Sequence, residues 1–252
     1  IMIRRLIKNI IFSQKIPVYS RFMTFFCKKY LDYYYGDNNF DRNINGERKL
    51  LKSLSGKLKI AFDVGANVGD YAKDILSYNP GCVVHCFEPD TRAFNKIEKS
   101  NSIIANNFAL GEKEEQKLIN LNQKSTHNSF YSLEENGQQK LVQIKTLDSY
   151  VQEKQIKSID FLKIDTEGYE YNVLLGAKNT LTNNSIKYIQ FEFSGANVYS
   201  RVFLKDFIDL LSSNYDLFRI RAEDIKKIDW SPELERFTLT NYIAIRKDLL
   251  LK

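Results

Sequence analysis

Short, continuously apolar segments alternate with helical segments from residue 58 onward. The apolar segments are residues 58–64, 82–87, 103–110, 159–164 and 186–193. The helical segments between and after them are residues 71–78, 91–99, 169–175 and 203–212. Strands that are apolar throughout are typical of a parallel sheet covered by helices on both faces. The sequence therefore predicts an α/β fold with a mostly parallel sheet.

Three further regions complete the predicted organisation. Residues 215–220 and 240–245 read as two closing strands whose short connection favours antiparallel pairing. Residues 117–145 read as an insertion, in which two exposed strands flank a polar stretch. Residues 1–56 are rich in helical and aromatic patterns, with a helix at 48–54 that stops at Gly56. We expect residues 1–56 to form a helical extension that caps the substrate site or a membrane surface, and residues 57–252 to form the main domain.

The segment Phe62–Tyr71 joins the first predicted strand to the first predicted helix. Glycine is scarce, at 11 of 252 residues, yet Gly65 and Gly69 both lie here. Such glycines permit a sharp turn and a close approach of ligand or helix. Asn67 stands where a dinucleotide fingerprint has its second glycine. An acid at Asp63 suits an ammonium group better than phosphates, which favours S-adenosylmethionine as the ligand.

Further candidate residues follow the next strands. Glu88, in a turn stiffened by Pro89, is placed to accept hydrogen bonds from both hydroxyls of a ribose. Asn107, Phe108 and Ala109 form the expected adenine wall. The predicted cofactor-binding residues are Asp63, Gly65, Ala66, Asn67, Gly69, Tyr71, Glu88, Pro89, Asn107, Phe108, Ala109 and Asp165.

Taken together, these segments resemble the FkbM-type family of S-adenosylmethionine-dependent methyltransferases. The resemblance covers roughly residues 58–195 and is most specific at Lys163–Glu170 (KIDTEGYE), followed by VLLGA. It implies a Rossmann-like class I methyltransferase fold, with a seven-stranded sheet whose last strand is antiparallel. It also implies O-methylation of a sugar hydroxyl in a cell-surface glycan, glycolipid or secondary metabolite.

A hydroxyl acceptor needs a group that removes its proton. The candidates are His127 in the insertion, Asp165 after the fourth strand and Glu192 in the fifth. His85 lies within an apolar strand and is interpreted as a core residue with a satisfied ring. The carboxylates also permit a divalent metal, which the sequence does not require; zinc is disfavoured by having only two histidines.

Composition bears on compartment and partners. The net charge is +6, and most of the basic residues are lysines spread along the chain. This distribution argues against a nucleic-acid partner. Cys27, Cys82 and Cys86 are interpreted as reduced, buried thiols of a cytoplasmic protein. Residues 3–11 form a basic amphipathic pattern without a signal-peptide cleavage site. It is interpreted as a helix packed on the body or, alternatively, lying on the inner face of a membrane. The aromatic residues in 30–40 are interpreted as core.

Other functions stay open from the sequence. They are N- or carboxyl-methylation of a peptide or small molecule, an NAD-dependent oxidoreductase, and a non-catalytic glycan-binding module. The missing G-x-G-x-x-G argues against the oxidoreductase. Replacing Asp63 or Glu88 by Ala, or Gly65 by Val, is predicted to abolish cofactor binding while the fold is retained.

Overall fold

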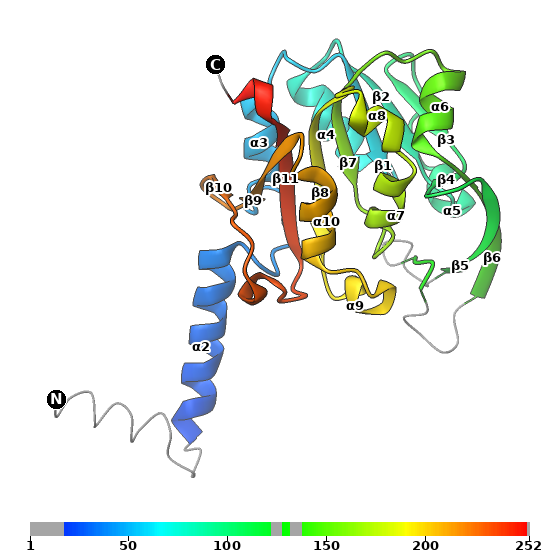
Figure 1. Ribbon diagram of the computed structural model, residues 1–252. Helices are drawn as coiled ribbons and strands as arrows, with labels where there is room; N and C mark the ends of the chain where they lie inside the picture. Colours follow the sequence, from blue (N-terminus) through cyan, green and yellow to red (C-terminus); the bar gives the residue numbers. More distant parts are fainter. Residues whose placement is uncertain (1–17, 122–127, 132–137, 251–252) are drawn as a thin grey trace.

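The computed structural model describes residues 18–121, 128–131 and 138–250. Within these residues, an eight-stranded sheet forms the centre of the molecule, and a three-stranded sheet lies beside it (Figure 1). His127 lies outside the described residues, as do residues 1–17, which include the predicted amphipathic segment at 3–11.

The central sheet has the order β10-β9-β11-β8-β7-β1-β2-β3. Its strands are β1 (Ile60–Val64), β2 (Val83–Phe87), β3 (Ile103–Asn106), β7 (Ile159–Ile164), β8 (Ile186–Phe193), β9 (Tyr215–Ile220), β10 (Ile225–Lys227) and β11 (Thr240–Arg246). Strands β3, β2, β1, β7 and β8 are mutually parallel, and β11 inserts antiparallel between β8 and β9. The predicted antiparallel closing pair is therefore confirmed.

One strand more is present than the seven expected. β10 is a three-residue, exposed strand that pairs with β9 at the edge of the described sheet. Its sequence, Ile-Lys-Lys, lacks both an apolar run and an alternation long enough to signal a strand. The predicted strand at 103–110 also divides into β3 and β4 (Ala109–Leu110), which belong to different sheets. Between them, the side-chain amide of Asn107 donates to the carbonyl of Glu88 at 2.8 Å.

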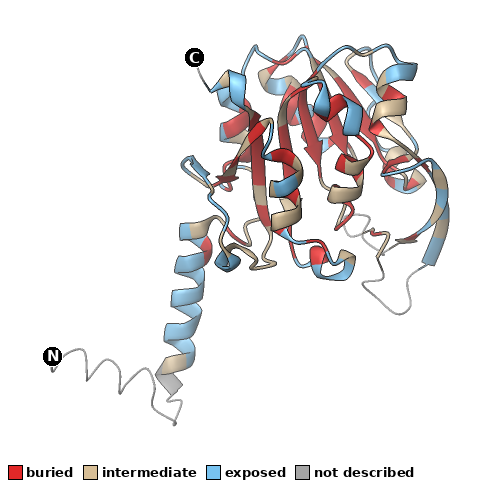
Figure 2. Cartoon of the chain, in the orientation of Figure 1, coloured by how far each residue is buried: buried red, intermediate tan, exposed pale blue. Residues whose placement is uncertain are grey.

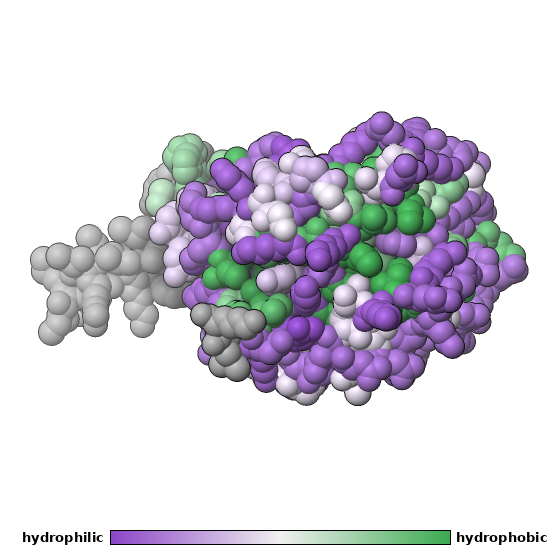
Figure 3. Space-filling model, turned by 90° about the horizontal axis from the view of Figure 1, so that it is seen from above, coloured by the Kyte–Doolittle hydropathy of each residue, from purple (hydrophilic) through white to green (hydrophobic). Residues whose placement is uncertain are grey.

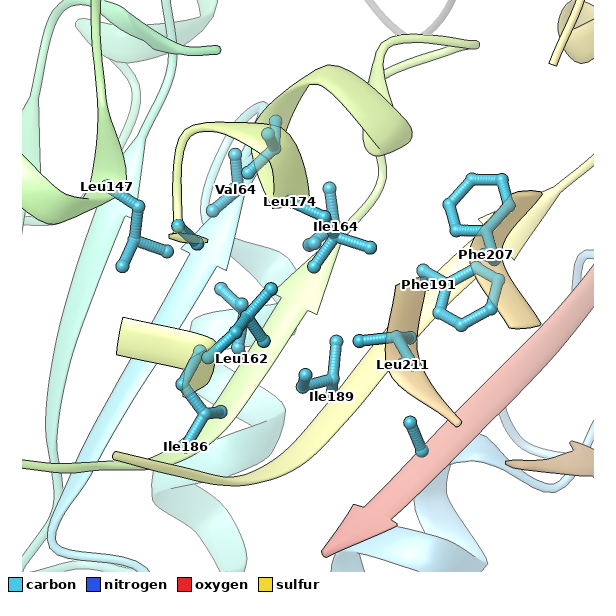
Figure 4. Close-up of a cluster of buried hydrophobic side chains, with 14 of the residues drawn as sticks. Val64, Leu147, Leu162, Ile164, Leu174, Ile186, Ile189, Phe191, Phe207 and Leu211 are labelled. Carbon is cyan, nitrogen blue, oxygen red and sulfur yellow. The ribbon is translucent and has the colours of Figure 1, made fainter. Parts of the chain in front are cut away.

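Helices cover both faces of the central sheet, and each face has its own apolar cluster. The helices are α3 (Glu47–Ser53), α4 (Asp70–Tyr78), α5 (Thr91–Phe94), α6 (Leu147–Glu153), α7 (Glu170–Leu175), α8 (Lys178–Thr182), α9 (Ala196–Ser200) and α10 (Leu204–Leu211) with the 3-10 turns η2 (Pro232–Leu234) and η3 (Lys247–Leu249). On one face, Leu174 of α7 and Phe207 of α10 pack over Ile164 and Phe191 (Figure 4). On the other, Leu51 of α3 and Ile75 of α4 share a cluster. This double coverage explains why all six residues of β7 are buried.

The insertion forms the second sheet, in the order β4-β6-β5. β5 (Glu115–Leu121) and β6 (Gln138–Lys145) pair antiparallel. They lie where the two exposed strands of the insertion are predicted. Ser129 pairs with Asn120, and its hydroxyl donates to the carbonyl of Glu167 at 2.7 Å. The insertion is thereby fastened to the turn that follows β7.

The N-terminal part begins with α2 (Val18–Tyr35), which stands out from the body (Figures 1 and 2). The interpretation of the aromatic residues in 30–40 as core is wrong, because Tyr30, Tyr33 and Phe40 are all at least 66% exposed. Cys27, on the same helix, is exposed as well, whereas Cys82 and Cys86 are buried as predicted. Apolar spacing alone does not say whether a helix face has a partner.

Candidate active site

The turn after β1 is built from residues in the left-handed backbone region. Gly65 has φ 81°, Asn67 φ 48° and Gly69 φ 84°. A Cβ atom on Gly65 would lie 1.8 Å from the carbonyl oxygen of Asp165. Gly69 caps the start of α4. The chain thus reverses within a few residues and leaves room beyond the carboxyl ends of β1, β2 and β7.

Glu88 is a buried carboxylate at the end of β2. Its Oε2 accepts the Asn67 N–H at 2.8 Å, and its Oε1 accepts the Asp90 N–H at 2.7 Å. Burial raises the pKa of Glu88 to about 7, although these two hydrogen bonds work to lower it. Each oxygen keeps a further lone pair for a ligand donor. This fixed carboxylate fits the hydroxyls of a ribose.

Asp63 is fully buried at the end of β1. Neither of its carboxylate oxygens has a hydrogen-bond partner among the residues that the structure describes. Burial raises the pKa of Asp63 to about 6 against the opposing effect of the Lys163 ammonium. The Ala72 N–H also lowers this pKa, although it does not reach hydrogen-bond geometry. A buried acid without a partner is costly, and a cationic ligand group would offset that cost.

Two adjoining cavities meet at this turn. The first, of about 190 Å³, is lined by Glu88, Pro89 and Ala109 among others. The second, of about 240 Å³, is lined by Asp63 and Glu192 among others. Both are bordered by Gly65, Asn67 and Asp165. One elongated ligand can therefore extend from the first cavity into the second.

Acidic side chains gather around the second cavity and the turn after β7. The Lys163 ammonium donates to Asp165 at 2.8 Å. Although burial works to lower it, Asp165 and Asp63 raise the pKa of Lys163. Burial raises the pKa of Glu167 to about 8 and that of Glu192 well above its usual value, and Asp165 adds to both shifts. Among the described residues, no three His, Cys, Asp or Glu side chains come together in a way that suits a metal ion.

Most of the predicted residues line one cavity or both. Those lining the first are Gly65, Asn67, Glu88, Pro89, Ala109 and Asp165, and those lining the second are Asp63, Gly65, Ala66, Asn67, Tyr71, Asp165 and Glu192. Asn107 instead holds the turn at Glu88, while Phe108 packs against the rings of Phe87 and Tyr150. The prediction for His85 is confirmed: its ring is buried and its Nδ1 shares a hydrogen bond with Tyr150 at 2.8 Å.

Sequence reasoning missed residues from two segments. Asn128 and Phe130 of the insertion line the first cavity, and Arg42 and Asn45 of the N-terminal part line the second. Their segments carry no motif, and only the fold brings them to the site. Gln190 offered a signal, because it is a lone amide in the apolar run of β8. It accepts the Tyr71 hydroxyl at 2.7 Å and donates to Glu47 at 2.6 Å, which joins the N-terminal part to the sheet.

The sheet order, the glycine turn and the carboxylates beyond the strand ends define a class I methyltransferase fold. The methyltransferase FkbM domain family matches residues 63–218, which is more than half of the chain. The chain belongs to this family and is a methyltransferase.

Individual relatives are distant. The 2-O-methyltransferase NoeI of Sinorhizobium fredii (strain NBRC 101917 / NGR234) is 27% identical over 187 residues, which cover 66% of this chain and 76% of NoeI. The methyltransferase FkbM structure from Methylobacillus flagellatus KT is 16% identical with a TM-score of 0.45, covering 74% of this chain and 43% of that one. The N-methyltransferase NodS from Bradyrhizobium japonicum WM9 is 8% identical with a TM-score of 0.44, covering 82% and 98%. The chain thus spans less than half of the Methylobacillus protein.

Proposed function

We propose that this methyltransferase transfers the methyl group of S-adenosylmethionine to a hydroxyl oxygen of a saccharide. The proposal rests on the pair of joined cavities. One holds the oriented carboxylate of Glu88, and the other holds the carboxylate of Asp63, which has no hydrogen-bond partner in the part of the chain that the structure describes. Similarity to a 2-O-methyltransferase supports oxygen as the acceptor atom.

The chain's residues fit the cofactor part by part. Glu88 would hold the ribose hydroxyls, and Pro89 and Ala109 would flank the adenine in the first cavity. Asp63 would pair with the ammonium of the methionine part, since a buried carboxylate binds a cation strongly. When bound, the cofactor supplies an electrophilic methyl group on a sulfonium.

Glu192 is the proposed acceptor of the hydroxyl proton. It lines the second cavity, and burial raises its pKa, which makes the carboxylate a stronger proton acceptor. Asp165 borders both cavities and is held by Lys163 at 2.8 Å, which suits a positioning role. His127 stays a prediction, because it lies outside the described residues.

The lining of the second cavity supports a saccharide acceptor. Arg42, Asn45 and Asn241 bring hydrogen-bonding groups to it, and the largely exposed ring of Phe40 lies at its border. Polar side chains beside an exposed aromatic face suit a sugar, which presents hydroxyls around an apolar ring face. A surface glycan, a glycolipid and a glycosylated metabolite all have this chemistry.

Calorimetry with S-adenosylmethionine, S-adenosylhomocysteine and NAD tests the cofactor. The protein is expected to bind both S-adenosyl ligands and not to bind NAD. Binding of NAD but of neither S-adenosyl ligand would overturn the proposal. The acceptor is then sought by mass spectrometry, with methyl-labelled cofactor and a panel of saccharides, peptides and amines. Label on a sugar oxygen is expected, and label on nitrogen or carboxyl groups only would refute the acceptor class.

A further inference from the structure

The helix α2 carries an exposed aromatic surface. Every residue from 21 to 31 is exposed, and Phe22, Phe25, Phe26 and Tyr30 are each more than half exposed (Figure 2). The body, in contrast, is mostly hydrophilic in the view from above, with apolar patches between the polar side chains (Figure 3). So many bare rings on one element indicate an interaction surface.

The spacing of these rings gives the helix a defined face. Phe22, Phe26, Tyr30 and Tyr33 follow one another at intervals of four, four and three residues, so they lie on one side. The rings of Phe22 and Phe26 are 4.5 Å apart. At 100° per residue, Lys28 falls on the opposite side of the helix.

The net charge of the protein is concentrated in and before this helix. Residues 1–31 hold seven of the 37 Lys and Arg residues and none of the 31 Asp and Glu residues. The remaining residues therefore carry 30 basic and 31 acidic side chains, which nearly cancel. Lysines do occur along the whole chain, but the excess does not, which corrects the expectation of a spread charge.

The base of α2 is fixed to the body. Asp37, just after the helix, accepts hydrogen bonds from Thr240 at 2.7 Å and Arg219 at 3.0 Å, and it is 2% exposed. The Asn38 N–H donates to the carbonyl of Leu239 at 2.8 Å. These bonds hold the helix at the start of β11, which lies beside the carboxyl end of β8.

The active-site cavity opens at this same edge of the sheet. Asn39, Phe40 and Arg42, which follow the anchored turn, line the second cavity. Figure 1 shows α2 leaving the body on the side where β7 and β8 end. A surface bound by α2 would therefore lie next to the edge that carries the cavity.

We propose that α2 docks this protein on an anionic lipid surface. The aromatic side would enter the headgroup region, where Phe and Tyr rings are stable, and the basic side chains would face the lipid phosphates. The proposed contact is peripheral. Within the described residues no helix is long and apolar enough to cross a bilayer. A second copy of the chain is the less favoured occupant, because pairing two such helices brings together two segments of seven positive charges each.

Vesicle flotation tests this directly with the full chain. The protein is expected to float with vesicles of phosphatidylcholine mixed with phosphatidylglycerol, to float poorly with phosphatidylcholine alone, and to be released by salt. Equal binding to both vesicle types, or none to either, would overturn the proposal.

Matched variants distinguish a specific role of α2 from an effect of the protein's total charge. Phe22→Ser with Phe26→Ser removes apolar area, and Lys28→Glu with Lys29→Glu reverses two charges. Each pair is expected to lower the partition onto anionic vesicles about tenfold or more. Lys52→Glu with Lys57→Glu makes the same charge change on exposed residues of α3 and of the segment after it, and is expected to have little effect. An equal loss in this control pair would refute a specific role for α2.

Light scattering without lipid distinguishes self-association. A monomeric wild type is expected. The contrary outcome is a wild type that forms a dimer and does not bind vesicles, and that becomes monomeric on Phe22→Ser with Phe26→Ser. It would show that α2 binds a second copy of the chain instead. All four substituted side chains of α2 are exposed, so unchanged unfolding midpoints are expected and confirm that the body stays folded.

Discussion

The turns that carry Gly65 and Asp165 touch through their backbones. A Cβ on Gly65 would come within 1.8 Å of the Asp165 carbonyl oxygen. The Gly65 N–H also donates to the carbonyl of Phe87 at 3.0 Å, which adds the end of β2 to the same contact. Three strand ends are therefore locked together at the point where the two cavities meet. The geometry of the site and the stability of the fold depend on one another here.

Gly65→Ala is expected to destabilise the protein as well as to impair the site. A non-glycine residue at φ 81° costs about 1–3 kcal/mol, and the clash with Asp165 adds to this. Thermal unfolding measures the effect. This corrects the expectation that replacing Gly65 leaves the fold intact. Gly81→Ala is the matched control, since a Cβ there meets nothing within 4 Å, and a change of no more than about 0.5 kcal/mol is expected.

Asp63→Asn and Glu88→Ala should show which part of the cofactor each carboxylate binds. Asp63→Asn is expected to weaken S-adenosylhomocysteine about tenfold or more but to spare methylthioadenosine, which has the ribose and lacks the ammonium. Glu88→Ala is expected to weaken both, because it removes the partner of the ribose hydroxyls. Calorimetry with the two ligands gives the comparison. Equal losses for both ligands in Asp63→Asn would contradict the assigned direction of binding.

Glu192→Gln is expected to lower kcat about a hundredfold or more, the usual worth of a general base. The affinity for S-adenosylhomocysteine should stay close to that of wild type, because Glu192 is assigned to the hydroxyl of the acceptor and not to a group of the cofactor. The measurements are turnover with an identified acceptor and calorimetry on the same preparation. Unchanged turnover would exclude Glu192 as the base. Glu98→Gln, at a solvent-exposed acid, serves as the control.

Glu170→Gln should change how stability depends on pH. Burial raises the pKa of Glu170 to about 7 in the folded protein, from 4.5. The folded state thus holds a proton that the unfolded chain releases between about pH 4.5 and 7, and stability falls as pH rises through this window. Glutamine does not titrate, so the variant should gain on the order of 2 kcal/mol relative to wild type between pH 4.5 and 8. Denaturant unfolding at both pH values tests this, and a constant difference would refute it.

The layout of the main domain was predictable because it depends on local signals. A parallel strand covered on both faces is mostly apolar, and four of the six buried residues of β7 are apolar, the exceptions being Asp160 and Lys163. The turn at Gly65 needs positive φ, which makes a scarce glycine informative. Glu88 was predictable because the end of β2 fixes its place. β10 was not, since three exposed residues carry no pattern.

The walls of the site were decided by tertiary structure. Asn128 and Phe130 reach the first cavity because Ser129 is tied to the turn after β7, across 38 residues of sequence. Arg42 reaches the second because Asp37 is anchored to β9 and β11. Contacts between segments so distant in sequence leave no local pattern.

The sequence by itself determined the strand and helix order, the glycine turn and the carboxylates at the strand ends, since backbone geometry and burial dictate residue type there. Only the tertiary structure decided which segments close the cavities and that the rings of α2 are bare. An aromatic stripe has the same spacing whether it packs against a sheet or faces outward, and only the position of α2 relative to the body separates the two.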